Sequence, residues 1–149
     1  MPKIEKITKQ TENPYVNLYL VEGKNKVDHP FRYYVASRAK TMEALKIKTK
    51  KNTPDGVLMY SLYGEKRDKI VLVRQYRVSI DDYIYEFPAG LVESGEEFHE
   101  AAVREMHEET GLTFHPLKVD PCYEKPFFTT IGMTDEACSA VYGWGGGEV

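Results

Sequence analysis

The feature that most constrains this chain is a cluster of acidic residues in its second half. Glu105, Glu108 and Glu109 follow Arg104 within one and a half helical turns. Like charges at these spacings on a helix repel each other unless something neutralises them. Oxygen ligands of this kind suit a hard divalent cation such as Mg²⁺, whereas acidic runs are also commonly just solvated helix surface. The cluster therefore predicts either a cation site or a solvated acidic face.

Local signals place this cluster on a helix. Ser94 and Glu97 have the spacing of a capping box, and Gly111 stands where a left-handed C-terminal cap belongs. We predict a helix from about residue 95 or 96 to Thr110. Its core-facing side would carry Phe98, Ala102 and Met106, with the glutamates on the adjoining arc.

The first third of the chain is typical of a small antiparallel sheet. Residues 17–21 and 31–36 are rich in aromatic and β-branched side chains, and they predict a hairpin. The alternation at 47–49 suggests a third short strand. We predict an N-terminal β appendage over residues 1–52 and a main domain over residues 53–149.

The main domain has the pattern of a mixed sheet with one helix. Residues 57–62 and 69–76 predict a second hairpin, and residues 83–87 predict a strand that Pro88 ends. Strands are expected within 112–123 and 136–144, after the helix. The fold class predicted is α+β, a mixed β-sheet plus the antiparallel appendage.

The flanks of the acidic cluster add a longer pattern. Gly90 is followed after five residues by Glu96, and seven residues later by Arg104 and the glutamates, ending at Gly111-Leu112. This segment resembles the Nudix box at each of its specified positions. The resemblance implies an α/β/α Nudix fold and Mg²⁺-dependent hydrolysis of a nucleoside diphosphate linked to another moiety, with Mn²⁺ as a possible substitute.

The same resemblance implies roles for individual residues. Glu105 and Glu109 would be the principal metal ligands, and Glu108 a further ligand or the group that polarises a water. Arg104 would hold the carboxylates in place. The main-chain carbonyl of Ala89 would be an additional metal ligand.

Three further segments resemble the ADP-ribose pyrophosphatase branch of the family: residues 73–77, 85–93 and 132–136. The branch implies hydrolysis of ADP-ribose to AMP and ribose 5-phosphate. Arg77 would then bind a phosphate, Glu86 and Glu93 would line the site near the metal, and Met133 and Glu136 would contact the terminal ribose. Taken singly, Arg77 and Glu86 are equally consistent with ordinary surface charges.

Other substrates and a different class of function stay open. A nucleoside-diphosphate sugar or a dinucleoside polyphosphate has the same diphosphate chemistry. A non-catalytic Nudix-like sensor of ADP-ribose or nucleotides would bind without cleavage, although such a sensor usually has a decayed box. The branch normally continues into a loop that carries the catalytic base, so we expect either a chain that is incomplete at its C-terminus or an enzyme that lacks this loop.

The composition and net charge limit the classes of partner that we expect for this chain. The formal net charge of −3 lacks the basic excess that drives nucleic-acid binding, and the apolar runs are too short for a bilayer. With no apolar leader, a cytoplasmic location is expected, and Cys122 and Cys138 are assigned no chemistry.

A homodimer through the N-terminal appendage is predicted, because a two- or three-stranded sheet is marginal alone and has open edges. In similar enzymes the appendages are exchanged between the two copies. The aromatic residues of its second strand are candidates for an adenine clamp or for the core of the appendage itself: Phe31, Arg32, Tyr33 and Tyr34.

Overall fold

The computed structural model describes residues 1–148, which form two compact units. Unit 1 comprises Met1–Thr53 together with Phe128–Glu136, and unit 2 comprises Pro54–Phe127 and the chain from Ala137 onward. No helix among residues 1–148 has the length and apolar character needed to cross a membrane.

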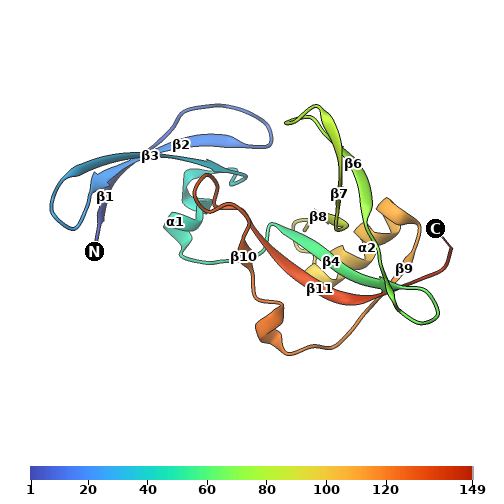
Figure 1. The fold of residues 1–149 in the computed structure, drawn as a ribbon. Coiled ribbons are helices and arrows are strands. Elements are labelled where there is room, and N and C mark those ends of the chain that lie inside the picture. Colours follow the sequence, from blue (N-terminus) through green and yellow to red (C-terminus); the bar gives the residue numbers. More distant parts are fainter. Residues whose placement is uncertain (149) are drawn as a thin grey trace. The chain divides into compact units, whose positions relative to one another are not determined.

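Unit 1 is built on a three-stranded antiparallel sheet in the order β1-β2-β3 (Figure 1). Its strands are β1 (Lys3–Lys9), β2 (Asn17–Lys24) and β3 (Pro30–Ser37). The predicted hairpin is confirmed as β2–β3. Tyr19 and Val21 of the central strand β2 are buried, at 0% and 4% exposure.

The third strand of this sheet was predicted wrongly. It is β1, whereas residues 47–49 lie in the short helix α1 (Lys46–Thr49), which follows the 3₁₀ turn η1 (Met42–Ala44). Leu45 between the two turns is 2% exposed and anchors them. The buried Leu45 keeps the backbone on either side of it in helical turns. The alternating pattern at 47–49 covers only three residues, which is too short to favour a strand over these turns.

The loop 128–136 packs against β3 within unit 1. The amide of Ala36 donates to the carbonyl of Met133 at 2.9 Å, and the Tyr33 hydroxyl donates to the carbonyl of Gly132 at 2.6 Å. Tyr33 is thus tied to this loop in the described structure.

Unit 2 contains a mixed sheet with β4 and β11 at its centre. These two strands are parallel, β5 and β8 pair antiparallel with β4, and β9 pairs antiparallel with β11. The strands are β4 (Gly56–Tyr63), β5 (Lys69–Ile70), β8 (Ala89–Leu91), β9 (Thr113–Pro116) and β11 (Ala137–Gly146), with η2 (Pro121–Tyr123) and β10 (Phe127–Phe128) between β9 and β11. The predicted α+β class is confirmed.

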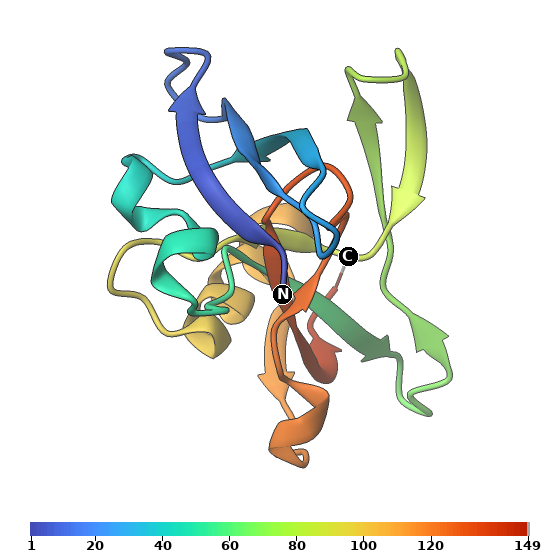
Figure 2. The same cartoon turned by 90° about the vertical axis from the view of Figure 1, so that its left-hand side faces the viewer.

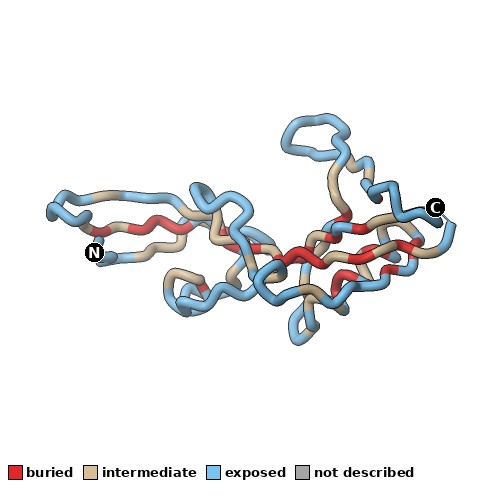
Figure 3. The backbone as a smooth tube through the Cα atoms, turned by 60° about the horizontal axis from the view of Figure 1, so that its bottom comes forward, coloured by how far each residue is buried: buried red, intermediate tan, exposed pale blue. Residues whose placement is uncertain are grey.

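Helix α2 (Phe98–Thr110) covers one face of this sheet. Met106 of α2 packs with Met59 of β4 and Val141 of β11, all of them 0% exposed. In Figure 3, where the tube is coloured by the burial of each residue, red segments mark the buried residues of this core. Burial of about three such side chains contributes several kcal/mol, so the acidic helix is held to the sheet by its apolar side.

The ends of α2 test the capping prediction. Gly111 is left-handed, with a φ of 74°, and its amide donates to the carbonyl of His107, as predicted. The start is corrected: α2 begins at Phe98, and Glu97 is the N-cap, whose carboxylate accepts from the amide of His99. The box Ser94–Glu97 does not form, because Glu97 itself occupies the capping position.

The predicted strand 69–76 is broken in two. Val71 is 9% exposed and its amide donates to the carbonyl of Ser61, so the chain turns inward here. It then leaves the sheet to form a separate ribbon from β6 (Val73–Arg77) and β7 (Asp82–Glu86), which Figure 2 shows as an extended pair of strands. Pro88 follows β7, as expected.

Candidate functional site

Strand pairing fixes the loop that precedes α2. Leu58 of β4 lies opposite Ala89 and Val57 lies opposite Gly90. The amide of Met59 donates to the carbonyl of Pro88 at 2.9 Å. This register places the backbone of Ala89 and Gly90 directly beside the acidic arc of α2.

Gly90 touches that arc. A Cβ atom built at Gly90 would lie 1.9 Å from Cδ of Glu105. No side chain fits at such a distance, so only glycine lets the backbone approach the Glu105 carboxylate this closely.

Arg104 holds several of the neighbouring carboxylates. Its Nε and Nη2 donate to the two oxygens of Glu96 at 2.9 Å each, and its Nη1 donates to Glu105 Oε1 at 2.8 Å. A longer contact of 3.4 Å reaches Glu108, and Nη2 also donates to the carbonyl of Leu91. These bonds raise the pKa of Arg104, and the guanidinium lowers the pKa of Glu96.

Glu109 is the residue on which the site converges. Its Oε2 accepts from the amide of Ala89 at 3.1 Å. Burial raises the pKa of Glu109; the Ala89 amide opposes this shift, the nearby charges of Glu105 and Glu86 add to it, and Arg77 counteracts it. The fold therefore brings Arg77, Glu86 and the box glutamates into one electrostatic environment.

Arg77 and Glu86 form an ion pair at the edge of this environment, with Arg77 Nη2 2.5 Å from Glu86 Oε1. Glu86 Oε1 is buried and accepts no aligned hydrogen bond within residues 1–148. The contact with Arg77 is thus electrostatic and close, without hydrogen-bond geometry.

The carboxylate oxygens around Glu109 are of the type that binds a divalent cation. Glu105, Glu108 and Glu109 offer only oxygen, and burial of Glu109, together with the nearby charges of Glu105 and Glu86, raises its pKa. Within residues 1–148 no three acidic, histidine or cysteine side chains are already gathered as a ligand cluster. Arg104 and the Ala89 amide engage these carboxylates instead.

The remaining predicted site residues are Glu93, Met133 and Glu136, and the amide of Glu93 donates to Glu96 Oε2 at 2.9 Å. Glu93 is exposed. Met133 and Glu136 belong to unit 1, where they line a pocket of about 290 Å³ with Arg38, whose Nε donates to Glu136 Oε1 at 2.7 Å. Sequence reasoning missed Arg38, because no local signal links residues 98 positions apart.

Glu96 was also given no role from the sequence, although it stands in the box. Its bidentate contact with Arg104 spans eight positions, from the loop to the helix. Its fixed spacing from Arg104 in the motif is the signal that could have identified it.

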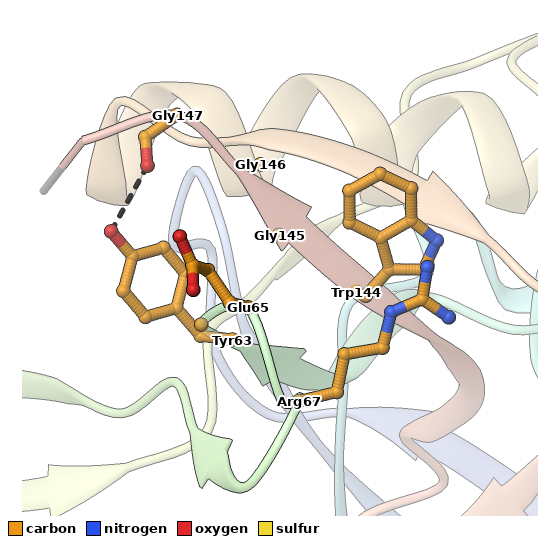
Figure 4. Close-up of a pocket in the computed structure, with 8 residues that line it drawn as sticks. Tyr63, Glu65, Arg67, Trp144, Gly145, Gly146 and Gly147 are labelled. Carbon is orange, nitrogen blue, oxygen red and sulfur yellow. Dashed lines mark hydrogen bonds between the residues drawn. The ribbon is translucent and has the colours of Figure 1, made fainter.

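A separate hollow of about 380 Å³ lies at the far end of β4 (Figure 4). Arg67 stacks over the Trp144 ring at 4.6 Å, and the Tyr63 hydroxyl donates to the carbonyl of Gly147 at 3.0 Å. Because Ala89 pairs near the beginning of β4 and Tyr63 ends it, this hollow is distinct from the acidic site.

Comparison with known proteins gives concordant results. Residues 52–142 match the family model described as NUDIX domain. The chain is 44% identical over 68 residues to an ADP-ribose pyrophosphatase of Bacillus subtilis, covering 46% of this chain and 35% of that protein. It is 35% identical over 80 residues to an ADP-ribose pyrophosphatase of Saccharomyces cerevisiae, covering 52% of this chain and 35% of that protein.

A mouse ADP-sugar pyrophosphatase is 36% identical over 87 residues, which cover 56% of this chain and 40% of that protein. The matched segments thus span about a third to two-fifths of these relatives. Among solved structures, a crystal structure of ADP compounds hydrolase shares the fold with a TM-score of 0.70, at 19% identity, over 96% of this chain and 66% of that one. The domain match over more than half of the chain, together with the loop and helix described above, shows that this protein belongs to the Nudix family.

Proposed function

We propose that this protein hydrolyses the diphosphate of ADP-ribose, yielding AMP and ribose 5-phosphate, with Mg²⁺ as cofactor. The observation that carries the proposal is the convergence on Glu109 of the Ala89 backbone, Glu105, Glu86 and Arg77. The similarity to named ADP-ribose pyrophosphatases supports this choice of substrate.

Each group has a task in such a reaction. Glu105, Glu108, Glu109 and the Ala89 carbonyl would hold the cation. When bound, Mg²⁺ neutralises diphosphate charge and acidifies an attacking water. Arg104 keeps Glu105 oriented through its bond at 2.8 Å, and Arg77 offers a guanidinium to a phosphate. Met133 and Glu136 would contact the terminal ribose, and Glu93 would line the site.

A turnover assay tests this function. Purified protein with ADP-ribose and Mg²⁺ should release AMP and ribose 5-phosphate, and replacing Mg²⁺ by Mn²⁺ tests the cation preference. ADP-glucose and diadenosine polyphosphates serve as competing substrates, because the mouse relative is named for ADP-sugars. Tight binding of ADP-ribose in calorimetry without any product would instead identify a sensor and reject the hydrolase.

A further inference from the structure

The β6–β7 ribbon has two different faces. Opposite pairs Arg77–Asp82, Gln75–Ile84 and Val73–Glu86 share one face, since side chains alternate along a strand. Arg77 and Glu86 are therefore on the same face but two rows apart. To make its contact, the Arg77 side chain runs back along the ribbon over the row between them.

This long reach ends on a buried atom. The Glu86 side chain is 23% exposed, against 45% for Arg77, and Glu86 Oε1 lies 2.5 Å from the guanidinium. A buried carboxylate oxygen without hydrogen bonds is costly unless a cation lies beside it. Arg77 supplies that cation. Because the buried Glu86 carboxylate needs a positive charge beside it, the ion pair fixes the position of the Arg77 guanidinium.

The pair also lies within electrostatic range of the box. Glu86 lies three residues before Ala89, whose amide donates to Glu109 Oε2 at 3.1 Å. Without Glu86, the half-exposed Arg77 would have Asp82 as the carboxylate on its own ribbon face, and Asp82 lies two rows away from Glu86.

We propose that Glu86 is a positioning residue, which holds Arg77 beside the box carboxylates until the diphosphate of the substrate binds the guanidinium in place of Glu86. Glu86 acts through Arg77 and ligates neither cation nor substrate. The inference rests on the proposed function and replaces the direct site contact that the family resemblance implies for Glu86.

A double-mutant cycle tests this coupling. Glu86→Gln keeps the shape and removes the charge that holds Arg77, so KM for ADP-ribose should rise about tenfold while kcat changes less than about threefold, because phosphate binding is lost uniformly. Arg77→Ala should raise KM by at least as much. In the Arg77→Ala background, Glu86→Gln should add no further increase.

Matched controls separate coupling from general charge effects. Arg74→Ala removes a guanidinium from the same strand but from the opposite ribbon face, where it stacks on Tyr83. Glu65→Gln removes an exposed carboxylate at the far end of β4. Both should leave KM within about twofold of the parent protein. Comparable KM increases in these controls would refute a specific Arg77–Glu86 coupling.

Binding of Mn²⁺ alone, followed by electron paramagnetic resonance, supplies a readout that does not depend on turnover. Glu86→Gln leaves Arg77 unpaired near the cation site and should weaken Mn²⁺ binding several-fold, whereas the double variant should return to within about twofold of the parent. Persistent weakening of tenfold or more in the double variant would show that Glu86 is itself a ligand and would overturn the proposal.

The two proposals fail in different ways. Absence of ADP-ribose hydrolysis in the parent protein would remove the proposed function, while the Mn²⁺ titration would still test the role of Glu86. Additive KM effects in an active enzyme would remove the positioning role and leave the function standing.

Discussion

The backbone of Gly90 lies against the side chain of Glu105, so the position of this backbone and the position of the Glu105 carboxylate depend on each other. The loop backbone is fixed by pairing with β4, and Arg104 fixes Glu105 from the other side. Neither partner can retreat without breaking a hydrogen bond. The geometry of the acidic site is therefore sensitive to a single added methyl group.

Gly90→Ala should lower kcat/KM for ADP-ribose by about 100-fold, because a displacement of Glu105 of about 1 Å misplaces a proposed ligand. Overpacking should also cost about 1–3 kcal/mol of unfolding free energy, measured by urea denaturation. Gly132→Ala is the stability control, since a Cβ there meets open space. A Gly90→Ala enzyme with normal turnover would show that this close approach has no role.

Glu109→Gln should abolish most ADP-ribose hydrolysis without lowering the stability of the metal-free protein. The folded state raises the pKa of Glu109, chiefly through burial, so it holds the proton more tightly than the unfolded chain does. Ionised Glu109 therefore destabilises the fold once the pH exceeds its folded pKa, and this cost disappears as the pH falls below the ordinary carboxyl range near 4.

Thermal unfolding in the presence of a chelator checks this sign. At pH 7 the Glu109→Gln variant should have a Tm equal to or above that of the parent, and the difference should shrink toward pH 4. A variant that unfolds well below the parent at pH 7 would contradict the charge argument. Retained turnover at saturating Mg²⁺ would remove Glu109 from the proposed ligands.

At the scale of elements, α2 is held at its start by more than its cap. His99 interacts through Nε2 with Glu124 at 2.8 Å and through Nδ1 with Glu97 at 3.0 Å. Glu124 is the C-cap of η2, and its carbonyl accepts from the Ser139 hydroxyl of β11. This imidazole thus links the beginning of the acidic helix to the connection between β9 and β11.

This link predicts pH-dependent stability. Burial alone would lower the pKa of His99, but its contacts with Glu124 and Glu97 outweigh burial and raise the pKa. The stabilisation is therefore complete below the ordinary histidine pKa of about 6.5 and is lost as the pH rises through the folded value. His99→Gln should lower Tm at pH 6 by roughly 1–3 °C, and less at pH 9.

His29→Gln, at an exposed position in the turn between β2 and β3, serves as the control and should leave this pH dependence unchanged. Differential scanning calorimetry at both pH values measures the effect. An equal loss at pH 6 and pH 9 would mean that His99 contributes by packing alone.

At the scale of the whole molecule, we expect a homodimer formed through unit 1. Leu18 of β2 is 36% exposed, and Tyr33 and Tyr34 of β3 are 46% and 50% exposed. Among residues 1–148 the outer edge of β1 has no partner strand, whereas the outer edge of β3 is covered at Ala36 by the loop 128–136. A second copy would cover such surface.

Sedimentation velocity of the full chain tests this expectation, and Leu18→Glu should shift the protein toward the monomer. The exposed substitution Val27→Glu, in the turn between β2 and β3, is the matched control and should leave the sedimentation coefficient unchanged. A parent protein that is monomeric at micromolar concentration would reject the dimer.

The sequence by itself determined the features that depend on neighbours along the chain. The β2–β3 hairpin, the acidic helix with its Gly111 cap and the order of the box residues follow from alternation, capping and spacing over a few residues. Glu105, Glu108 and Glu109 share one helical arc for the same reason. Local backbone preference is sufficient for each of these features.

Only the tertiary structure decided the contacts between distant residues. It chose β1 as the third strand of unit 1, broke the strand after Ile70 and paired Arg38 with Glu136. It also brought Arg77 and Glu86 into range of Glu109. Such pairs form because burying a side chain or a charge requires a partner from whatever segment the fold places nearby, and a linear pattern does not encode which segment that is.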